Sequence, residues 1–395
     1  MKIYADNAAT TKMSQTAVEA MLPYLTECFG NPSSLYEAGQ KAKEALETAR
    51  EEIARIIHAS PREIVFTSGG SEADNQAILS AAALGEKKGK RHIVSTAIEH
   101  HAVLHTLKKL EKQGFDVTLL PVHEDGIVRP EELKAALRED TCLVTVMYAN
   151  NEIGTLQPIR EIGELCKEKG IPFHTDAVQA VGHLSMDVER DGVTLLSASA
   201  HKFHGPKGVG FLYARKGFRL SNLIEGGAQE RGKRAGTENV AGIVAMAAAL
   251  KEAEANREAT ALRLTALRDR LIEGLAAIPH SALNGDAQKR LPGNVNFCFE
   301  GIEGESLLLL LDDRGICASS GSACTSGSLD PSHVLLAIGR KHDVAHGSLR
   351  LTLGEDATEE EVDYIIQTVT ETVDRLRSFS PVWRDLCSGK SPFIL

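Results

Sequence analysis

Several features that mark other protein classes are missing from this 395-residue sequence. Its seven cysteines are an odd number with no Cys-x-x-Cys pair, which favours reduced thiols in a cytoplasmic protein over a disulfide framework. The longest apolar runs, 243–250 and 307–311, are far shorter than the roughly 20 residues that a membrane span needs. The first seven residues contain no charged and apolar leader, so we expect no secretion signal.

The charge balance and the missing nucleotide motifs argue against further classes. Lys and Arg number 44 against 54 Asp and Glu, and the resulting net charge of −10 disfavours nucleic-acid binding. No Gly-x-Gly-x-x-Gly follows a first strand, so a nicotinamide enzyme has little support. Gly227–Lys233 has the spacing of a phosphate-binding Walker loop, but Arg234 replaces the Ser or Thr that would hold magnesium. We therefore interpret this segment as a basic loop.

The histidines do not complete a metal site. His101 and His105 have the i,i+4 spacing of helical metal ligands, but no His-Glu-x-x-His motif or convergent cysteine set accompanies them. We expect no metal, and a structural role for these two residues.

The first two thirds of the chain alternate between short β-branched runs and helical stretches. This order, with apolar strands, predicts an α/β domain whose mainly parallel sheet is buried on both faces. Functional residues then gather beyond the carboxyl ends of the strands. The expected strands are 64–67, 92–96, 117–122, 143–148, 173–175, 194–198 and 210–213, and the expected helices are 72–88, 102–112, 130–138 and 159–169.

The last third predicts a smaller α+β unit. Residues 237–277 are almost purely helix-forming and are expected to link two bodies. We expect the final segment, Leu386–Leu395, to be loosely held. Strands are expected at 295–299, 316–319 and 348–353, and helices at 305–312, 331–338 and 359–376.

Lys202 is the first candidate for chemistry. It follows an apolar strand in the segment Ser197–Gly210 and lies between His201 and His204. A lysine at such a strand end, desolvated and near other cations, has a lowered pKa, and its amine can attack a carbonyl. The alternative is an ordinary surface lysine, which is how we interpret Lys207.

Two further segments also follow predicted strands. Asp176 is a carboxylate that is costly to bury unless a cation or donors meet it, and it suits the protonated ring nitrogen of a cofactor as well as a helix N-cap. Gly70 and Ser71 lie at a glycine-rich junction where the free amides of a helix start suit a phosphate.

His100 and Cys324 complete the candidates. His100 precedes a predicted helix, where its imidazole could stack on a flat cofactor ring. Cys324 lies in a run of small and polar residues that cannot form an apolar core, so its thiol is expected to be accessible and reactive, although an incidental exposed cysteine is the alternative. Cys142 and Cys298, in contrast, stand in apolar surroundings.

Together these segments resemble one family over nearly the whole chain. HKFHGPKG (201–208) and SSGSACTSG (319–327) are the specific motifs, and YADNAATT (4–11), GNPSS (30–34), FTSGGSEADN (66–75), EHHAV (99–103), NNEIGTLQP (150–158), HTDAVQ (174–179), RAGTEN (234–239) and SLRLTLG (348–354) accompany them in order. The sequence resembles the pyridoxal-phosphate-dependent cysteine desulfurases of the NifS/IscS-like group.

The resemblance implies a fold and a division of the chain. The expected fold is that of the type I pyridoxal-phosphate-dependent transferases, with a seven-stranded, mainly parallel sheet flanked by helices in the large domain. The large domain is expected to span 15–260, and the small α+β domain 1–14 and 261–395, with a mobile loop at about 320–332 that carries the catalytic cysteine.

The resemblance also implies the roles of the site residues. Lys202 would bind pyridoxal 5′-phosphate covalently, Cys324 would take the sulfur of L-cysteine as a persulfide, and His100 would stack on the ring and act in acid/base steps. Asn31 and Arg350 would hold the substrate carboxylate. The implied cofactor-binding residues are Gly70, Ser71, His100, Asn151, Asp176, Gln179, Ser199, His201, Lys202 and Thr237.

Partners and pathway follow from the same resemblance. Thr237 would reach the cofactor of a neighbouring subunit, which implies a homodimer, and the sulfur would pass to an acceptor or a NifU/IscU-like iron–sulfur scaffold protein. Ser71 stands where family members often have Thr, and it retains the hydroxyl. The HKFH form is closer to the nitrogen-fixation type than to the housekeeping HKIY, so the pathway stays open. The alternatives are a related aminotransferase, a selenocysteine lyase and a non-catalytic scaffold.

Overall fold

The fold is described from a computed structural model for residues 2–320 and 331–395. The expected large sheet is present, with strand order β2-β8-β7-β6-β5-β3-β4. All neighbouring pairs are parallel except those made by β8, which runs antiparallel to β2 and β7. Its strands are β2 (Ile64–Thr67), β3 (His92–Thr96), β4 (Asp116–Leu120), β5 (Thr141–Thr145), β6 (Phe173–Asp176), β7 (Leu195–Ser199) and β8 (Gly210–Ala214).

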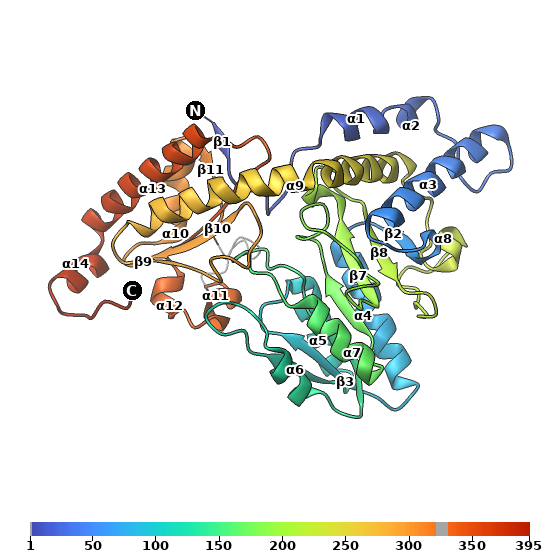
Figure 1. The fold of residues 1–395 in the computed structure, drawn as a ribbon, viewed down its shortest axis with the longest axis horizontal. Coiled ribbons are helices and arrows are strands. Elements are labelled where there is room, and N and C mark those ends of the chain that lie inside the picture. Colours follow the sequence, from blue (N-terminus) through green and yellow to red (C-terminus); the bar gives the residue numbers. More distant parts are fainter. Residues whose placement is uncertain (1, 321–330) are drawn as a thin grey trace.

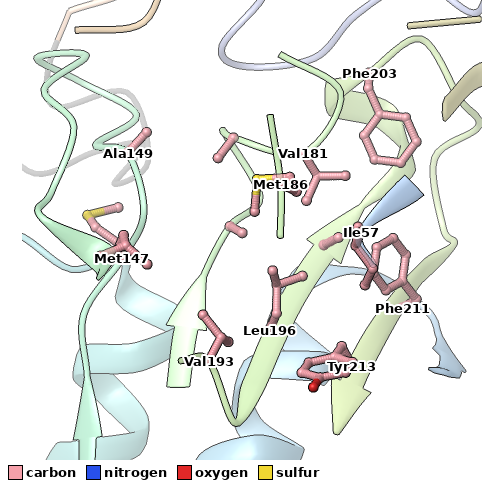
Figure 2. Packing of buried hydrophobic residues seen from close by; sticks show 14 of the residues in the cluster. Ile57, Met147, Ala149, Val181, Met186, Val193, Leu196, Phe203, Phe211 and Tyr213 are labelled. Carbon is pink, nitrogen blue, oxygen red and sulfur yellow. The ribbon is translucent and has the colours of Figure 1, made fainter. Parts of the chain in front are cut away.

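Helices cover this sheet and bury its strands. Apart from β4, the strands are buried throughout, as their apolar sequences require. Leu196 of β7 and Phe211 of β8 pack with Ile57 in the main hydrophobic core (Figure 2). The helices of this body are α1 (Gln15–Met21), α2 (Pro23–Thr26), α3 (Glu37–Ile56), α4 (Gly70–Glu86), α5 (His101–Glu111), α6 (Pro130–Ala136), α7 (Ile159–Lys169) and α8 (Gln229–Gly232), with the 3₁₀ turns η1 (Pro61–Glu63) and η2 (Ala200–Lys202).

The long helix α9 (Val240–Ala276) joins this body to a smaller one (Figure 1). Its first part, Val240–Leu250, packs into the core of the large body, whereas Leu264–Leu275 contributes to a second core. This change of partner is compatible with the predicted domain boundary near residue 260, which stays a prediction. Within the described residues, no helix is both long and apolar enough to span a membrane.

The smaller body is the expected α+β unit. A three-stranded antiparallel sheet has the order β12-β10-β9, and β1 pairs with β11 in parallel. The strand β1 therefore ties the start of the chain to residues more than 300 positions later. The elements are β1 (Ile3–Tyr4), β9 (Ser281–Leu283), β10 (Asn294–Phe299), α10 (Gly304–Asp313), β11 (Ile316–Cys317), α11 (His333–Ala337), α12 (His342–Ala345), β12 (Ser348–Thr352), α13 (Glu359–Phe379) and α14 (Pro381–Cys387).

The prediction of a loose C-terminal segment is wrong. The backbone N–H groups of Ile394 and Leu395 donate to the carboxylate of Glu300, at 2.8 and 3.1 Å. The ring of Phe393 stacks on His280 with 3.7 Å between the ring centroids. A carboxylate distant in sequence therefore holds the end of the chain.

The predicted basic loop contains a buried ion pair. Glu230, at the turn of α8, has a positive φ of 49° and forms a bidentate pair with Arg50 of α3, with both N···O distances at 2.8 Å. Glu230 also accepts from the backbone N–H of Phe66 in β2 at 2.9 Å. The side chains of Arg50 and Glu230 are 4% and 2% exposed, so each charge depends on the other.

We predict that Glu230→Ala lowers the free energy of unfolding by about 3 kcal/mol, because the buried Arg50 would lose its bidentate partner and keep only the half-exposed Glu47, 3.3 Å away. Urea unfolding followed by circular dichroism measures the change. As a control, Glu164→Ala removes an exposed pair with Arg160 and is expected to cost less than about 1 kcal/mol. Equal losses for the two variants would contradict the assignment.

Candidate active site

A cavity of about 660 Å³ opens at the carboxyl edge of the large sheet. Because the parallel strands all end at this edge, residues that are distant in sequence meet there. The N-terminal segment 8–10 and Arg350 of β12 complete its walls. The predicted site residues that line it are Gly70, Ser71, His100, Asn151, Asp176, Gln179, Ser199, His201, Lys202 and Arg350.

Lys202 follows β7 and points into this cavity. Its Nζ donates to the backbone carbonyls of Ala8 and Ala9, at 2.5 and 2.9 Å. The Ala8 carbonyl also accepts from Gln179 Nε2 at 3.0 Å. The amine is therefore held beside backbone acceptors inside the cavity, unlike a surface lysine that extends into water.

Asp176 ends β6 and is almost fully buried, with 5% of the residue exposed. Its carboxylate accepts from the backbone N–H of Val178 at 3.0 Å. Burial raises the pKa of Asp176, whereas nearby His100 and Lys202 lower it. The cavity thus contains a buried carboxylate that pairs well with a protonated ring nitrogen.

His100 caps the start of α5. Its Nδ1 accepts from the backbone N–H of Ala102 at 3.1 Å, so the proton of the neutral ring is on Nε2. Burial lowers the pKa of His100, and the opposing effect of Asp176 is the next largest cause. The residue therefore presents a neutral imidazole to the cavity.

An anion cradle lies at the start of α4. The first amides of this 17-residue helix lack partners within the helix, and Ser71, Ser199 and His201 line the cavity beside them. A Cβ at Gly70 would lie 2.5 Å from Val178 Cγ2, so the close approach there requires glycine. Burial lowers the pKa of His201 to about 4, which leaves it neutral.

Arg350 reaches the cavity from the small body. Its Nη2 pairs with Asp6 at 2.8 Å, and its Nη1 donates to the Asn151 carbonyl at 3.1 Å. Its Nε is buried and has no hydrogen-bond partner among the described residues. A cation therefore lies in the cavity wall, where it suits an anionic group.

The geometry agrees with the comparisons with known proteins. The sequence profile of the aminotransferase class-V family matches residues 3–365. A cysteine desulfurase IscS of Clostridium botulinum is 56% identical over 392 residues, which cover 98% of each chain. Among solved structures, a NifS-like protein has a TM-score of 0.90 and 40% identity, with 95% of this chain and 100% of that chain covered. The structure titled SspA in complex with cysteine has a TM-score of 0.78 and 36% identity, covering 89% and 99%.

The chain belongs to the cysteine desulfurases of the aminotransferase class-V family. Its cofactor is therefore pyridoxal 5′-phosphate. The residues present fit this group, because the cavity holds an amine for its aldehyde, a carboxylate for its ring nitrogen and a helix start for its phosphate. The predicted seven-stranded fold and the predicted family are thus both confirmed.

Two predicted residues of this desulfurase lie outside the cavity of their own chain, and a third is not among the described residues. Asn31 and Thr237 are exposed and lie outside it. Cys324 lies outside the described residues, as does most of the predicted loop. The roles of all three stay predictions.

Two residues of the site were missed by the sequence analysis. Asp74 lines the cavity although the sequence analysis quoted it only within the motif FTSGGSEADN, and Asp6 orients Arg350. Lys207 is exposed, as expected of a surface lysine, and lies at the cavity wall. Asp6 and Asp74 both stand in quoted motifs, but only the tertiary structure shows where their carboxyl groups lie.

Glu152, next to Asn151, binds the start of α11. Its carboxyl accepts a short hydrogen bond from the Ser332 hydroxyl, which also caps α11. Burial raises the pKa of Glu152 from 4.5 to about 7. The folded protein therefore binds this proton more tightly than the unfolded chain does.

We predict that Glu152 contributes a fall in stability as the pH rises from about 5 to 7, because the unfolded chain releases this proton near pH 4.5 whereas the folded protein holds it up to about pH 7. The shift corresponds to about 3 kcal/mol, and Glu152→Gln is expected to remove most of this contribution. Urea unfolding of both proteins at pH 5 and pH 8 measures it. The same pH dependence in both proteins would show that Glu152 is not protonated in the fold.

Proposed function

We propose that the cavity residues divide the desulfurase reaction on L-cysteine among themselves. Lys202 binds the cofactor through Nζ, and Asp176 pairs with the ring nitrogen. This assignment is carried by one observation: Lys202 and Asp176 face the same cavity from the ends of adjacent strands, with His100 close to both. Bound pyridoxal phosphate supplies an electron sink for negative charge at the substrate α-carbon.

The remaining residues hold the reactants in place. The start of α4, with Ser71, Ser199 and His201, binds the phosphate. Asn151 and Gln179 also line the cavity and would hydrogen-bond near the cofactor's phenolic oxygen. Released from the cofactor, Lys202 takes the α-proton of the substrate on Nζ, and His100 stacks on the ring and assists the proton transfers.

Arg350 binds the substrate carboxylate. Arg350 lines the cavity, and its 2.8 Å ion pair with Asp6 orients the guanidinium. A planar guanidinium holds a carboxylate through paired hydrogen bonds, which orients the substrate as well as binding it.

Cys324 receives the sulfur. Its thiolate attacks the sulfur of cysteine, an S–S bond forms, and the carbon–sulfur bond breaks with its electron pair left on the substrate carbon. Protonation of that carbon gives alanine, and the enzyme retains a persulfide. The sulfur then passes to an acceptor, for which an iron–sulfur scaffold protein is the predicted class.

The active form is a homodimer in this proposal. Leu22, Leu25, Phe29, Leu35 and Tyr36 are each more than 50% exposed, which is unusual for a cluster of large apolar side chains in a monomer. Asn31 lies within this segment, and Thr237 is exposed outside its own cavity. In the dimer, both residues would complete the site of the partner subunit. Sedimentation velocity tests whether the protein is a dimer.

For Cys324→Ala we expect the enzyme to bind its cofactor but to lose persulfide formation and alanine release by at least about a hundredfold, because the sulfur has no acceptor thiol. Mass spectrometry of the protein and an alanine assay measure the two products. Cys387→Ala, which removes an exposed cysteine in the small body, is the control and should react normally. Full turnover by Cys324→Ala would favour an aminotransferase.

For Lys202→Ala we expect borohydride treatment to leave no cofactor attached to the protein, because the amine that holds it is gone. Absorbance of the denatured, reduced protein measures the attachment. Lys207→Ala removes a second amine from the same cavity and should retain the attachment. Loss of attachment in the Lys207 variant alone would reassign the lysine.

A further inference from the structure

Asp74 is a carboxyl group that the proposed chemistry leaves unused. It lies in the second turn of α4, is 1% exposed and lines the cavity. Its Oδ1 is buried without a hydrogen-bond partner among the described residues. A buried carboxylate in this condition is costly, so the group needs either a cation or a proton.

A hydrogen-bonded group of side chains from the sheet ends beside Asp74. Thr145 Oγ1 lies 2.8 Å from His174 Nδ1, and His174 Nε2 lies 3.0 Å from Ser197 Oγ. The nearby Ser197 hydroxyl lowers the pKa of Asp74, but burial raises this pKa by more. Burial lowers the pKa of His174 to about 3, so this histidine is neutral and supplies no cation.

These contacts give Asp74 no charged partner. A neutral imidazole donates from one ring nitrogen and accepts at the other, and both nitrogens of His174 are engaged by the hydroxyls of Thr145 and Ser197. His174 Nε2 is 3.6 Å from Asp74 Oδ1, which exceeds a hydrogen-bond distance.

Asp74 and Asp176 are close enough to interact strongly. A carboxylate oxygen of Asp74, a ring nitrogen of His100 and a carboxylate oxygen of Asp176 all lie within 4.8 Å of one another. Two ionised carboxylates at this separation in a buried site repel each other, so the pair retains one proton. Asp176 accepts from the Val178 N–H and lies near His100 and Lys202, whereas Asp74 Oδ1 has no donor.

We propose that Asp74 is a second acid of the cofactor site and a positioning residue for the reaction: it holds a proton beside Asp176, so that Asp176 alone is negatively charged toward the ring nitrogen. The inference rests on the proposed role of Asp176. The groups that face Asp74 are Asp176 and His174 from β6, Glu99 and His100 before α5, and Ser197 from β7.

The electrostatics of the site agree with this assignment. Burial raises the pKa of Asp74 well above its ordinary value, and the charge of Asp176 raises it further. Burial also raises the pKa of Glu99 to about 8, so this neighbour is protonated as well. One carboxylate charge therefore remains among three buried acids.

Infrared spectroscopy of the apoenzyme tests the proposal directly, because protonated and ionised carboxyl groups absorb at different frequencies. Labelling aspartate with carbon-13 separates Asp74 from the protonated glutamates. We expect one protonated aspartate at pH 7 in the wild type and none in Asp74→Asn. In Asp176→Asn, which leaves Asp74 in place, the protonated band should disappear at a pH at least about one unit lower, a tenfold weaker hold on the proton.

The controls separate this inference from the role of Asp176. Glu152→Gln removes another buried acid and should leave the labelled aspartate band unchanged. Cofactor binding to the apoenzyme, followed by absorbance, should weaken at least about tenfold in Asp176→Asn. Normal cofactor affinity in that variant would overturn the role of Asp176. Two outcomes, each combined with weakened cofactor affinity in Asp176→Asn, would overturn the inference about Asp74 alone. The first is that the wild type shows no protonated aspartate. The second is that the protonated band titrates at the same pH in Asp176→Asn as in the wild type.

Discussion

The burial of a carboxylate at the end of β6 is the constraint on which the site depends. Asp176 is almost completely shielded from solvent, so groups that the fold brings to it must stabilise its negative charge. The N–H of Val178 and the neighbouring His100 and Lys202 do this from three different segments. The parallel strands bring these segments together, because their carboxyl ends all lie at one edge of the sheet.

Burial also explains why most titratable side chains around the cavity are neutral. Burial holds His100, His174 and His201 neutral, and it keeps protons on Glu99 and Glu152. A cofactor that carries both a phosphate and a ring nitrogen therefore meets few competing charges. Of the cations in the cavity wall, Lys202 and Arg350 each have a distinct partner in the N-terminal segment.

The N-terminal segment links the two bodies at the site. The carbonyls of Ala8 and Ala9 accept from Lys202, and Asp6 pairs with Arg350 and accepts from the Ser319 hydroxyl. The N-terminal segment therefore contacts both Lys202 of the large body and Arg350 of the small body. The described residues end at Ser320 on one side of the predicted cysteine loop and resume at Pro331 beside Ser332, which Glu152 holds.

What the sequence by itself determined is the set of local signals: apolar strands followed by Lys202 and Asp176, the glycine-rich start of α4, and the motifs that indicate the family. The sequence analysis also missed α3, although Ala42, Leu46, Ala49 and Ile53 recur at helical spacing and form its buried face. Nor did it reveal the binding of the C-terminal segment by Glu300 or the position of Asp74 beside Asp176, which only the tertiary structure decided. The reason is physical: the hydrophobic period and turn chemistry act between near neighbours, whereas the balance of buried charge depends on groups that come together only when the sheet has formed.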